Sequence, residues 1–208
     1  MLFLFDMDNV LYDYNWRIRM DGLTELTGHD FHELRRRWWN DRGEWAAERG
    51  DPATGVEYLE RVIAALEHDI SVPEWLFHRR AGMTPRPDVI EVAREASRHG
   101  DVAVLTNNGA LIGERLAELS PELVDVFGEN LFATAHFFAR KPEPLVFQRA
   151  LDHLGHSPEQ TFFVDDLPDN TRAADTLGIS TFIMGPTATA TDLTGAIEGF
   201  IETRRPRG

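Results

Sequence analysis

The stretch that decides the fold is Phe3-Leu4-Phe5-Asp6-Met7-Asp8-Asn9-Val10. The apolar run that ends at Phe5 has the length of a strand and little alternation, which is typical of strands buried on both faces of a parallel sheet. Asp6 and Asp8 follow it directly, two residues apart. Because α/β sheets bind ligands outside the carboxyl ends of their strands, this acid pair is a candidate site. Acids also form turns and helix caps, so the pair alone does not decide between the two roles.

Four further apolar runs have the same character: Val102–Leu105, Leu131–Thr134, Thr161–Val164 and Thr181–Met184. Apolar residues recur at helical spacing between them, for example from Val89 to Ala96 and from Leu145 to Leu154. Gly100, Gly155 and Gly178 stand where such helices should end. The alternation predicts an α/β fold with a doubly wound, mainly parallel sheet.

Residues 14–83 break this alternation. They hold all five tryptophans, a basic run and helical patterning without a clear buried strand. We therefore expect a small helical cap domain at 14–83, inserted after the first strand of an α/β core domain made of residues 1–13 and 84–208. Pro85-Arg86-Pro87 marks the return to the core. The end of the chain, from Arg204 to Gly208, is expected to be a frayed basic tail.

Composition and charge exclude several function classes. The 208 residues include 42% hydrophobic residues, enough for a substantial core, and 21 Lys+Arg stand against 35 Asp+Glu, for a formal net charge of −14. So acidic a surface repels phosphate backbones, and we expect neither nucleic acid nor an anionic membrane as a partner. The absence of cysteine removes disulfides, thiolate zinc sites and thiol nucleophiles. The opening apolar run is too short for a signal sequence or a membrane span, so we expect a soluble, cytoplasmic protein.

Polar side chains also follow the strand predicted at Val102–Leu105. Thr106, Asn107 and Asn108 come next, just before a helical stretch. Such residues serve as helix N-caps and turn formers. A hydroxyl beside the free amides of a helix N-terminus equally suits a phosphate oxyanion. Both interpretations stay open at this point.

A lysine and a second acid pair complete the set. Lys141-Pro142-Glu143-Pro144 is expected to open a helix. A cation there faces the unfavourable end of the helix dipole, so an anionic group should lie nearby unless the lysine is solvated. Asp165 and Asp166 follow the strand predicted at Thr161–Val164, with Asn170 a turn later. Adjacent carboxylates are costly without a cation, and Mg²⁺ prefers carboxylate oxygens and water, so this pair predicts a hard-cation site.

In order and spacing, these residues match the four motifs of a known superfamily: Asp6 with Asp8, Thr106-Asn107, Lys141-Pro142 and Asp165-Asp166. The chain resembles the haloacid dehalogenase (HAD) superfamily over nearly its whole length. Three features look closest to glucose-1-phosphate phosphatase-like members: Asn9-Val10, the turn Glu48-Arg49-Gly50-Asp51 and the ending Asp165-Asp166…Asn170. Two positions depart from the pattern, since Asn170 stands where many members have a second acid and Phe138 where many relatives have glycine.

The resemblance implies a Rossmann-like core and a role for each motif residue. Asp6 would attack phosphorus and form an aspartyl-phosphate, and Asp8 would protonate the leaving oxygen and then take a proton from water. Thr106 and Asn107 would hydrogen-bond the phosphoryl group. Lys141 would pair with that group and with Asp6. Asn108 is a further candidate for substrate binding.

Mg²⁺ is the cofactor that the resemblance implies. It would be held by Asp6, the backbone carbonyl of Asp8, and Asp166, with Asp165 in support. The expected function is a Mg-dependent phosphomonoester hydrolase that acts on a small phosphorylated metabolite, with a sugar phosphate as the preferred class. We expect it to work as a monomer or a homodimer.

Asp8 separates the alternatives. The 2-haloacid dehalogenases of this superfamily need no leaving-group acid and no metal, and they lack this second acid, so Asp8 favours a phosphatase. A phosphomutase would share Asp8 and stays open. A phosphorylation-controlled receiver module combines similar residues in a different order. A non-catalytic phosphate-binding protein fits poorly with the intact set of site residues, although one fold hosts several functions.

The resemblance makes the insert the specificity element, which closes over the catalytic edge and excludes water. Trp45 and Arg49 are its candidate substrate contacts, since aromatic rings beside charged groups suit a sugar. Trp38 and Trp39 have a second interpretation as the core of the insert itself. No second insert is expected in the span 107–141, which leaves room for little more than a helix and a strand.

Overall fold

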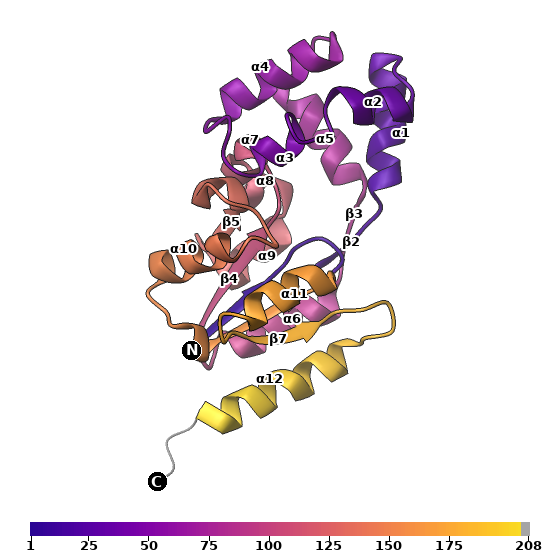
Figure 1. Cartoon of the computed structure of the whole chain (residues 1–208). Coiled ribbons are helices and arrows are strands. Elements are labelled where there is room, and N and C mark those ends of the chain that lie inside the picture. The colour runs from indigo at the N-terminus through magenta and orange to yellow at the C-terminus, as the bar shows by residue number, and fades with distance from the viewer. Residues whose placement is uncertain (205–208) are drawn as a thin grey trace.

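Five parallel strands form the central sheet of the protein, in the order β5-β4-β1-β6-β7 (Figure 1). Their bounds in the computed structural model, which describes residues 1–204, are β1 Leu2–Phe5, β4 Asp101–Thr106, β5 Leu131–Ala133, β6 Thr161–Asp165 and β7 Ser180–Ile183. Every neighbouring pair is parallel. Each strand lies within one residue of the run that predicted it.

Helices cover both faces of this sheet, so the fold is α/β and doubly wound, as predicted. One face carries α6 (Pro87–Ala96), α9 (Pro121–Phe127) and α12 (Ala190–Arg204), and the other carries α10 (Pro144–Leu154) and α11 (Pro168–Asp175). Successive residues of a strand point to opposite faces. Phe3 and Phe5 of β1 therefore pack with the first group of helices, and Leu2 and Leu4 pack with the second.

The span between β4 and β5 holds more than the expected single helix. Two short helices, α7 (Ala110–Glu114) and α8 (Leu116–Leu119), precede α9, and the 3-10 turns η1 (Thr134–Phe137) and η2 (Pro158–Gln160) lie further along. The expectation of little more than a helix and a strand was wrong. Pro121 begins α9, and a proline cannot donate the backbone hydrogen bond that would continue α8 into it.

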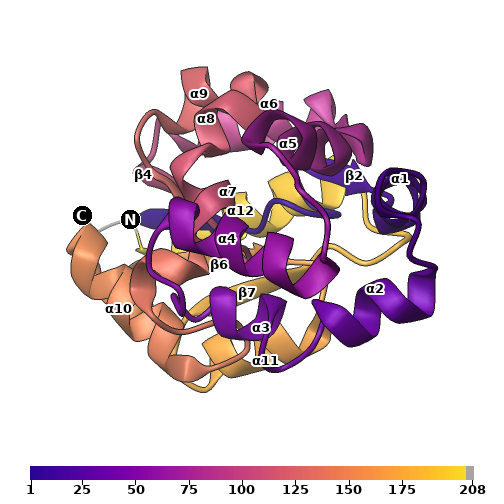
Figure 2. The ribbon, with the colours of Figure 1, turned by 90° about the horizontal axis from the view of Figure 1, so that it is seen from above.

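Five helices form the segment between Trp16 and Ala81, which we call the cap: α1 (Trp16–Thr27), α2 (Phe31–Arg37), α3 (Glu44–Ala47), α4 (Gly55–Leu66) and α5 (Val72–Ala81). Four of them begin at a side chain that accepts a backbone hydrogen bond, namely Asn15, Asp30, Thr54 and Ser71. The cap lies at one end of the central sheet in Figure 1 and over it when seen from above in Figure 2.

A two-stranded antiparallel ribbon joins the cap to the core. It pairs β2 (Tyr12–Tyr14) with β3 (Met83–Pro85). The sequence analysis did not predict this ribbon, because three residues are too few to show a period of two. The ribbon brings the two ends of the cap side by side, so the cap enters and leaves the core at one place.

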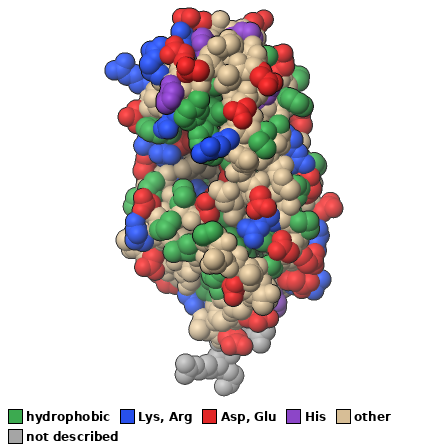
Figure 3. Space-filling model, turned by 90° about the vertical axis from the view of Figure 1, so that its right-hand side faces the viewer, with side chains coloured by type: hydrophobic (Ala, Val, Ile, Leu, Met, Phe, Trp, Pro, Cys, Tyr) green, Lys and Arg blue, Asp and Glu red, His purple; other side chains and the backbone are tan. Residues whose placement is uncertain are grey.

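The described chain ends in a helix, not in a frayed segment. Arg204 belongs to α12, and its Nε donates to the carbonyl of Glu159 at 2.9 Å. The rest of the predicted basic tail, 205–208, lies outside the described residues. No helix within residues 1–204 is both long and apolar enough to cross a bilayer. On the face shown in Figure 3, acidic and basic side chains are interspersed.

Candidate active site

Asp6 extends the central strand β1 at its carboxyl end. Its backbone N–H donates to the carbonyl of Val164 at 2.8 Å, which continues the pairing with β6. Because β1 lies between β4 and β6, the residues that follow these three strands meet at one edge of the sheet. The side chain of Asp6 is buried at this edge. Burial raises the pKa of Asp6 well above its ordinary value, and the charge of Lys141 opposes that rise.

The buried ammonium of Lys141 bridges two carboxylates. Its Nζ lies 2.8 Å from Oδ1 of Asp6 and donates to Oδ2 of Asp165 at 2.7 Å. Burial by itself lowers the pKa of Lys141, but the charges of Asp165 and Asp6 raise that pKa above its ordinary value. The lysine is therefore cationic. The anionic neighbours that the sequence predicted for it are present.

Lys141 does not open a helix, contrary to the sequence expectation. Helix α10 begins at Pro144, and Lys141 lies in the preceding turn, where a cis peptide bond joins it to Pro142. Asn107 holds this turn, because its Nδ2 donates to the carbonyl of Lys141 and its Oδ1 accepts from the backbone N–H of Lys141, both at 2.9 Å. Direct ion pairs, not the helix dipole, therefore set the surroundings of the ammonium.

Asp6, Asp165 and Asp166 form a cluster of potential metal ligands, with one ligand atom of each within 4.8 Å of the others. Carboxylate oxygens are the donors that Mg²⁺ prefers, so the cluster fits that ion. Asp166 is half-buried, and its Oδ2 accepts a hydrogen bond from Nδ2 of Asn9 at 2.9 Å. Burial raises the pKa of Asp166, and this hydrogen bond opposes the rise.

Asp165 already has its hydrogen-bonding capacity filled. Its Oδ1 accepts from the N–H of Leu167 at 2.8 Å and from Nδ2 of Asn170 at 2.9 Å. Its Oδ2 accepts from Nζ of Lys141 at 2.7 Å and again from Asn170 at 3.0 Å. A carboxylate offers about four lone-pair sites, so Asp165 orients Lys141, and Asp6 and Asp166 keep oxygens for a cation.

Asn170 has a clear role at the position where many relatives carry an acid. Its amide donates to both oxygens of the buried Asp165. An ionised second acid has no proton to donate and would repel that carboxylate. The departure from the family pattern therefore follows from the hydrogen bonds of Asp165.

Thr106 ends β4 at the same edge as Asp6. The register of β1 and β4 pairs Phe5 with Val104, so Asp6 lies one residue beyond this pair and Thr106 two residues beyond it on the neighbouring strand. Nδ2 of Asn108 donates to Oγ1 of Thr106 at 2.9 Å, and both side chains are buried. Because Thr106 accepts this bond, its own hydroxyl proton is available for a ligand.

Asp8 is paired with a cap residue that the sequence analysis missed. Nη2 of Arg79, in α5, donates to Oδ1 and Oδ2 of Asp8 at 2.6 and 2.8 Å. Arg79 is fully buried, and its guanidinium carbon lies 4.0 Å from the centre of the Tyr14 ring. Asp8 and Arg79 are 71 positions apart and share no motif, so only the packing of the cap on the core reveals the pair.

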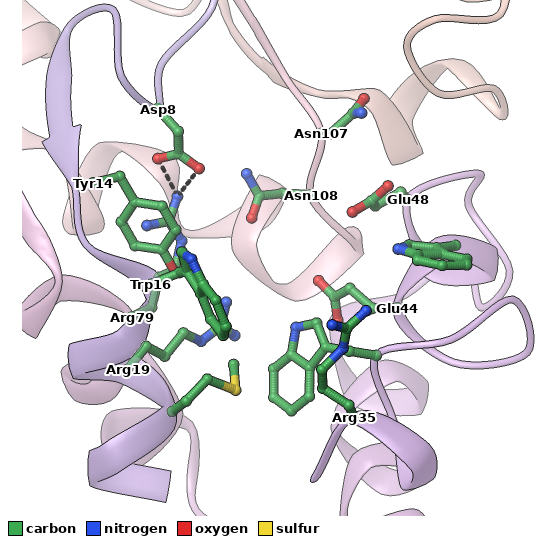
Figure 4. Close-up of a pocket in the computed structure, with 13 residues that line it drawn as sticks. Asp8, Tyr14, Trp16, Arg19, Arg35, Glu44, Glu48, Arg79, Asn107 and Asn108 are labelled. Atoms are coloured by element: carbon green, nitrogen blue, oxygen red, sulfur yellow. Dashed lines mark hydrogen bonds and ion pairs between the residues drawn. The ribbon is translucent and has the colours of Figure 1, made fainter. Parts of the chain in front are cut away.

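A cavity of about 370 Å³ lies between the cap and this edge of the sheet (Figure 4). The core contributes Asp8, Asn107 and Asn108 to its wall. The cap and the ribbon contribute aromatic side chains, namely those of Tyr14, Trp16, Trp39 and Trp45. This volume and the mixture of apolar walls with a few polar groups are typical of a small-molecule site.

Comparison with known families matches residues 1–178 to the family described as haloacid dehalogenase-like hydrolase. The chain belongs to the HAD-like hydrolase family. The match confirms the resemblance that the four motifs indicated. The closer likeness to glucose-1-phosphate phosphatase-like members stays a prediction.

Individual HAD-like relatives include a phosphatase. A protein named as a phosphatase, from Mycobacterium tuberculosis (strain CDC 1551 / Oshkosh), is 28% identical to this chain over 195 residues. The match covers 87% of this chain and 85% of the relative. A HAD family enzyme from Bacteroides thetaiotaomicron, solved with magnesium and inorganic phosphate, has a TM-score of 0.76 at 18% identity and covers 92% of this chain and 98% of its own. An L-2-haloacid dehalogenase from Xanthobacter autotrophicus, with chloropropionic acid covalently bound, has a TM-score of 0.59 at 17% identity. The match covers 86% of this chain and 75% of the dehalogenase chain. At these identities the two solved structures establish the HAD fold, and the reaction has to be argued from the site.

Phe138 occupies the second position where this HAD-like chain departs from the family pattern. Its φ of 50° lies in the left-handed region, where glycine avoids the steric cost of a Cβ. The ring of Phe138 lies so close to Gly50 of the cap that a Cβ at position 50 would be only 2.8 Å from Cδ1 of Phe138. Phe138 therefore keeps a backbone shape suited to glycine and adds a contact between core and cap.

Of the tryptophans and the arginine expected at the cap surface, some line the cavity and others do not. Trp45 and Trp39 line the cavity. Trp38 is buried in the cap, in line with its second interpretation. Arg49 does not line the cavity, and its Nε donates to Oε1 of Glu143 at 2.6 Å. Arg49 thus ties the cap to the turn before α10, and its contact with substrate stays a prediction.

Proposed function

We propose that this HAD-like hydrolase is a Mg²⁺-dependent phosphomonoesterase that acts on a small phosphorylated metabolite of the sugar phosphate class. The position of Asp8 carries the proposal. Asp8 follows Asp6 by two residues and lines the cavity, where the oxygen of a departing alcohol needs a proton. A departing halide needs none, so a dehalogenase has no use for an acid at this place.

Asp6 supplies the nucleophile in this proposal. One of its oxygens attacks phosphorus, the bond from phosphorus to the ester oxygen breaks, and an aspartyl-phosphate forms. Asp8 gives its proton to the departing oxygen and, now a carboxylate, takes a proton from a water molecule. That water attacks the same phosphorus, which releases inorganic phosphate and restores the carboxylate of Asp6.

Lys141 and Thr106 bind the phosphoryl oxygens. The ammonium of Lys141 is fixed by Asp6 and Asp165, so it is placed for the negative charge of the phosphoryl group before the ester arrives. Thr106 donates its hydroxyl proton. Asn107 holds the backbone of Lys141 and faces the cavity.

The metal site in this proposal consists of Asp6, the backbone carbonyl of Asp8, and Asp166. Asp165 supports it by orienting Lys141. When bound, Mg²⁺ neutralises negative charge on the phosphoryl oxygens and on Asp6. The close approach of three carboxylates supports a cation here, because like charges at this spacing otherwise repel.

We also propose that residues 14–83 act as a cap domain on a core of residues 1–13 and 84–208. Such a cap excludes water from the reaction and selects the leaving group. The net charge of −14 supports a small metabolite as partner in place of nucleic acid or an anionic membrane. A cytoplasmic location and a monomeric or homodimeric state stay predictions.

Release of phosphate from para-nitrophenyl phosphate tests the proposal. We expect release that needs Mg²⁺, stops with a chelator and is lost in Asp6→Asn and Asp8→Asn. Asp13→Asn is the matched control, because Asp13 is an exposed acid that follows β1 in the same segment. Release of chloride from chloroacetate without phosphate release would favour a dehalogenase. Phosphate transfer without release to water would favour a mutase.

A further inference from the structure

Arg19 is a cavity residue that the proposed mechanism does not use. It extends from α1 toward the cavity (Figure 4) and is only 4% exposed. Its guanidinium carbon lies 4.8 Å from the centre of the Trp75 ring and 5.4 Å from that of Trp39. Within residues 1–204, its Nε and Nη2 are buried without a hydrogen-bond partner.

The acids that line the same cavity have partners of their own. Asp8 is held by Arg79. Oε2 of Glu48 accepts from Nε of Arg140 at 2.5 Å. Oε2 of Glu44 accepts an indole N–H and a phenol O–H from the cap, each at 2.6 Å. None of these carboxylates lies within 4.0 Å of the guanidinium nitrogens of Arg19 in the described chain, so Arg19 has no ion pair there.

A buried guanidinium without a direct counter-ion is costly, because it gives up water without gaining charge-assisted hydrogen bonds in return. The faces of Trp39 and Trp75 offset part of this cost through cation–π attraction. Burial lowers the pKa of Arg19, but its neighbours Tyr14, Tyr58 and Glu44 raise it above its ordinary value. The result is a planar fork of donors, held in place by two aromatic rings, at the wall of a ligand-sized cavity.

A second cation lines this cavity from its solvent side. Arg35 belongs to α2 and is exposed. Arg79 offsets Asp8 and Arg140 offsets Glu48, so Arg19 and Arg35 stand against Glu44 alone. The cap side of the cavity therefore keeps one net positive charge, which attracts an anion. The guanidinium fork matches the geometry of carboxylate and phosphate oxygens.

We propose that Arg19 determines specificity for a leaving group that carries a second anionic group, a carboxylate or a second phosphate, remote from the reacting phosphoryl group. The inference rests on the proposed function for the reacting end of the cavity. It refines the substrate class from a neutral sugar phosphate to a phosphorylated sugar acid or a sugar bisphosphate. Trp39 and Trp45 flank the carbon skeleton, and Arg19 binds the remote anion.

Binding of sugars that lack the phosphate at C1 tests this, measured with Mg²⁺ removed by a chelator so that glucose 6-phosphate is not hydrolysed. Glucose, glucuronate and glucose 6-phosphate offer a hydroxyl, a carboxylate or a phosphate on one hexose skeleton. By calorimetry we expect the wild type to bind one of the two anionic sugars at least about tenfold more tightly than glucose. We expect Arg19→Met to remove that preference. Equal affinity for all three in the wild type, or a preference that survives Arg19→Met, overturns the proposal.

Two further variants keep the test decisive. Arg19→Lys retains the charge and loses the planar fork, so it should retain part of the preference even where Arg19→Met does not fold. Arg17→Met is the matched control, because Arg17 lies exposed on the same helix and does not line the cavity. A loss of preference in Arg17→Met equal to that in Arg19→Met would indicate a general charge effect and overturn the assignment.

Turnover separates this inference from the proposed function. The esters are glucose 1-phosphate, glucuronate 1-phosphate and glucose 1,6-bisphosphate, compared by kcat/KM with para-nitrophenyl phosphate as reference. Release from all esters without preference for an acidic one supports the phosphatase and overturns the acidic subsite. No release from any ester, with the Arg19-dependent binding preference intact, contradicts the phosphatase and supports the subsite.

Discussion

Nη2 of Arg79 donates to both carboxylate oxygens of Asp8, at 2.6 and 2.8 Å, and so joins cap helix α5 to the acid beside the cavity. Arg79 is held in turn by burial and by the ring of Tyr14. The position of Asp8 therefore depends on the cap as well as on β1. A cap that moves away from the core would release Asp8 from this contact.

We expect Arg79→Met to lower kcat by about 10- to 100-fold with a smaller change in KM, because small displacements of a catalytic group carry rate penalties of that size. A double-mutant cycle with Asp8→Asn identifies the cause. If Arg79 acts through Asp8, Arg79→Met causes little further loss in the Asp8→Asn background. Additive losses would show that Arg79 acts elsewhere.

The neighbouring arginine provides the control for this experiment. Arg80 also joins cap to core, through an ion pair with Glu122 at 2.5 Å, but it does not contact Asp8. Arg80→Gln should therefore change stability more than kcat. A loss of kcat in Arg80→Gln equal to that in Arg79→Met would attribute the effect to general loosening of the cap.

Replacement of Asn170 by the acid of its relatives should destabilise this chain. Asn170→Asp puts a carboxylate against the buried Asp165 and removes two donated hydrogen bonds. We expect the free energy of unfolding in a chelator to fall by about 2 to 4 kcal/mol. Thermal unfolding with and without Mg²⁺ measures this, and Asp169→Asn, at an exposed neighbouring position, should change little. An unchanged melting temperature in Asn170→Asp would contradict the role assigned to the amide.

The effect of replacing a metal ligand should depend on whether its carboxylate oxygens are already hydrogen-bonded to the protein. Asp166 has one oxygen bonded to Asn9 and the other free of protein partners within residues 1–204. We expect Asp166→Asn to raise the Mg²⁺ concentration for half-maximal activity by about tenfold or more, since loss even of groups that only support a ligand costs 10- to 100-fold. An activity titration with Mg²⁺ checks this. Asp175→Asn is an exposed control at the end of α11.

The sequence predicts the core and its motifs because both depend on local patterns. Short apolar runs without alternation mark the five strands, and parallel topology then brings the residues after β1, β4 and β6 to one edge. Asp6, Thr106 and Asp165 are found in this way. The prediction for Lys141 needs one further argument, namely that a cation at this place requires an anionic neighbour. The structure has two such neighbours, Asp6 and Asp165.

The cap contacts do not follow from local patterns. Arg79 meets Asp8, and Arg19 reaches the cavity, only through the angles at which the cap helices pack, and no spacing in the sequence encodes those angles. The contact of Arg49 with Glu143 was not foreseen for the same reason, because the two residues lie 94 positions apart. The ribbon β2–β3 was missed because its strands are three residues long.

Glu48 should give the folded protein a distinct dependence of stability on pH. It lies between cap and core, where Nε of Arg140 donates to it at 2.5 Å. Burial raises the pKa of Glu48 to about 7, and the charge of Arg140 opposes the rise. A glutamate in the unfolded chain titrates near 4.5. Between pH 4.5 and about pH 7, folded Glu48 therefore retains a proton that the unfolded chain has lost.

The direction of the effect follows from that difference. Below about pH 4.5 both states hold the proton, and the contribution of Glu48 to stability is complete. As pH rises toward about 7, the unfolded state loses its proton first, and the contribution is lost. Between about pH 5 and pH 8 we expect the wild type to lose about 1 to 3 kcal/mol more than Glu48→Gln in urea unfolding. Glu60→Gln, at an exposed position of α4, should follow the wild type. Parallel pH profiles for wild type and Glu48→Gln would show that Arg140 keeps Glu48 ionised across the range.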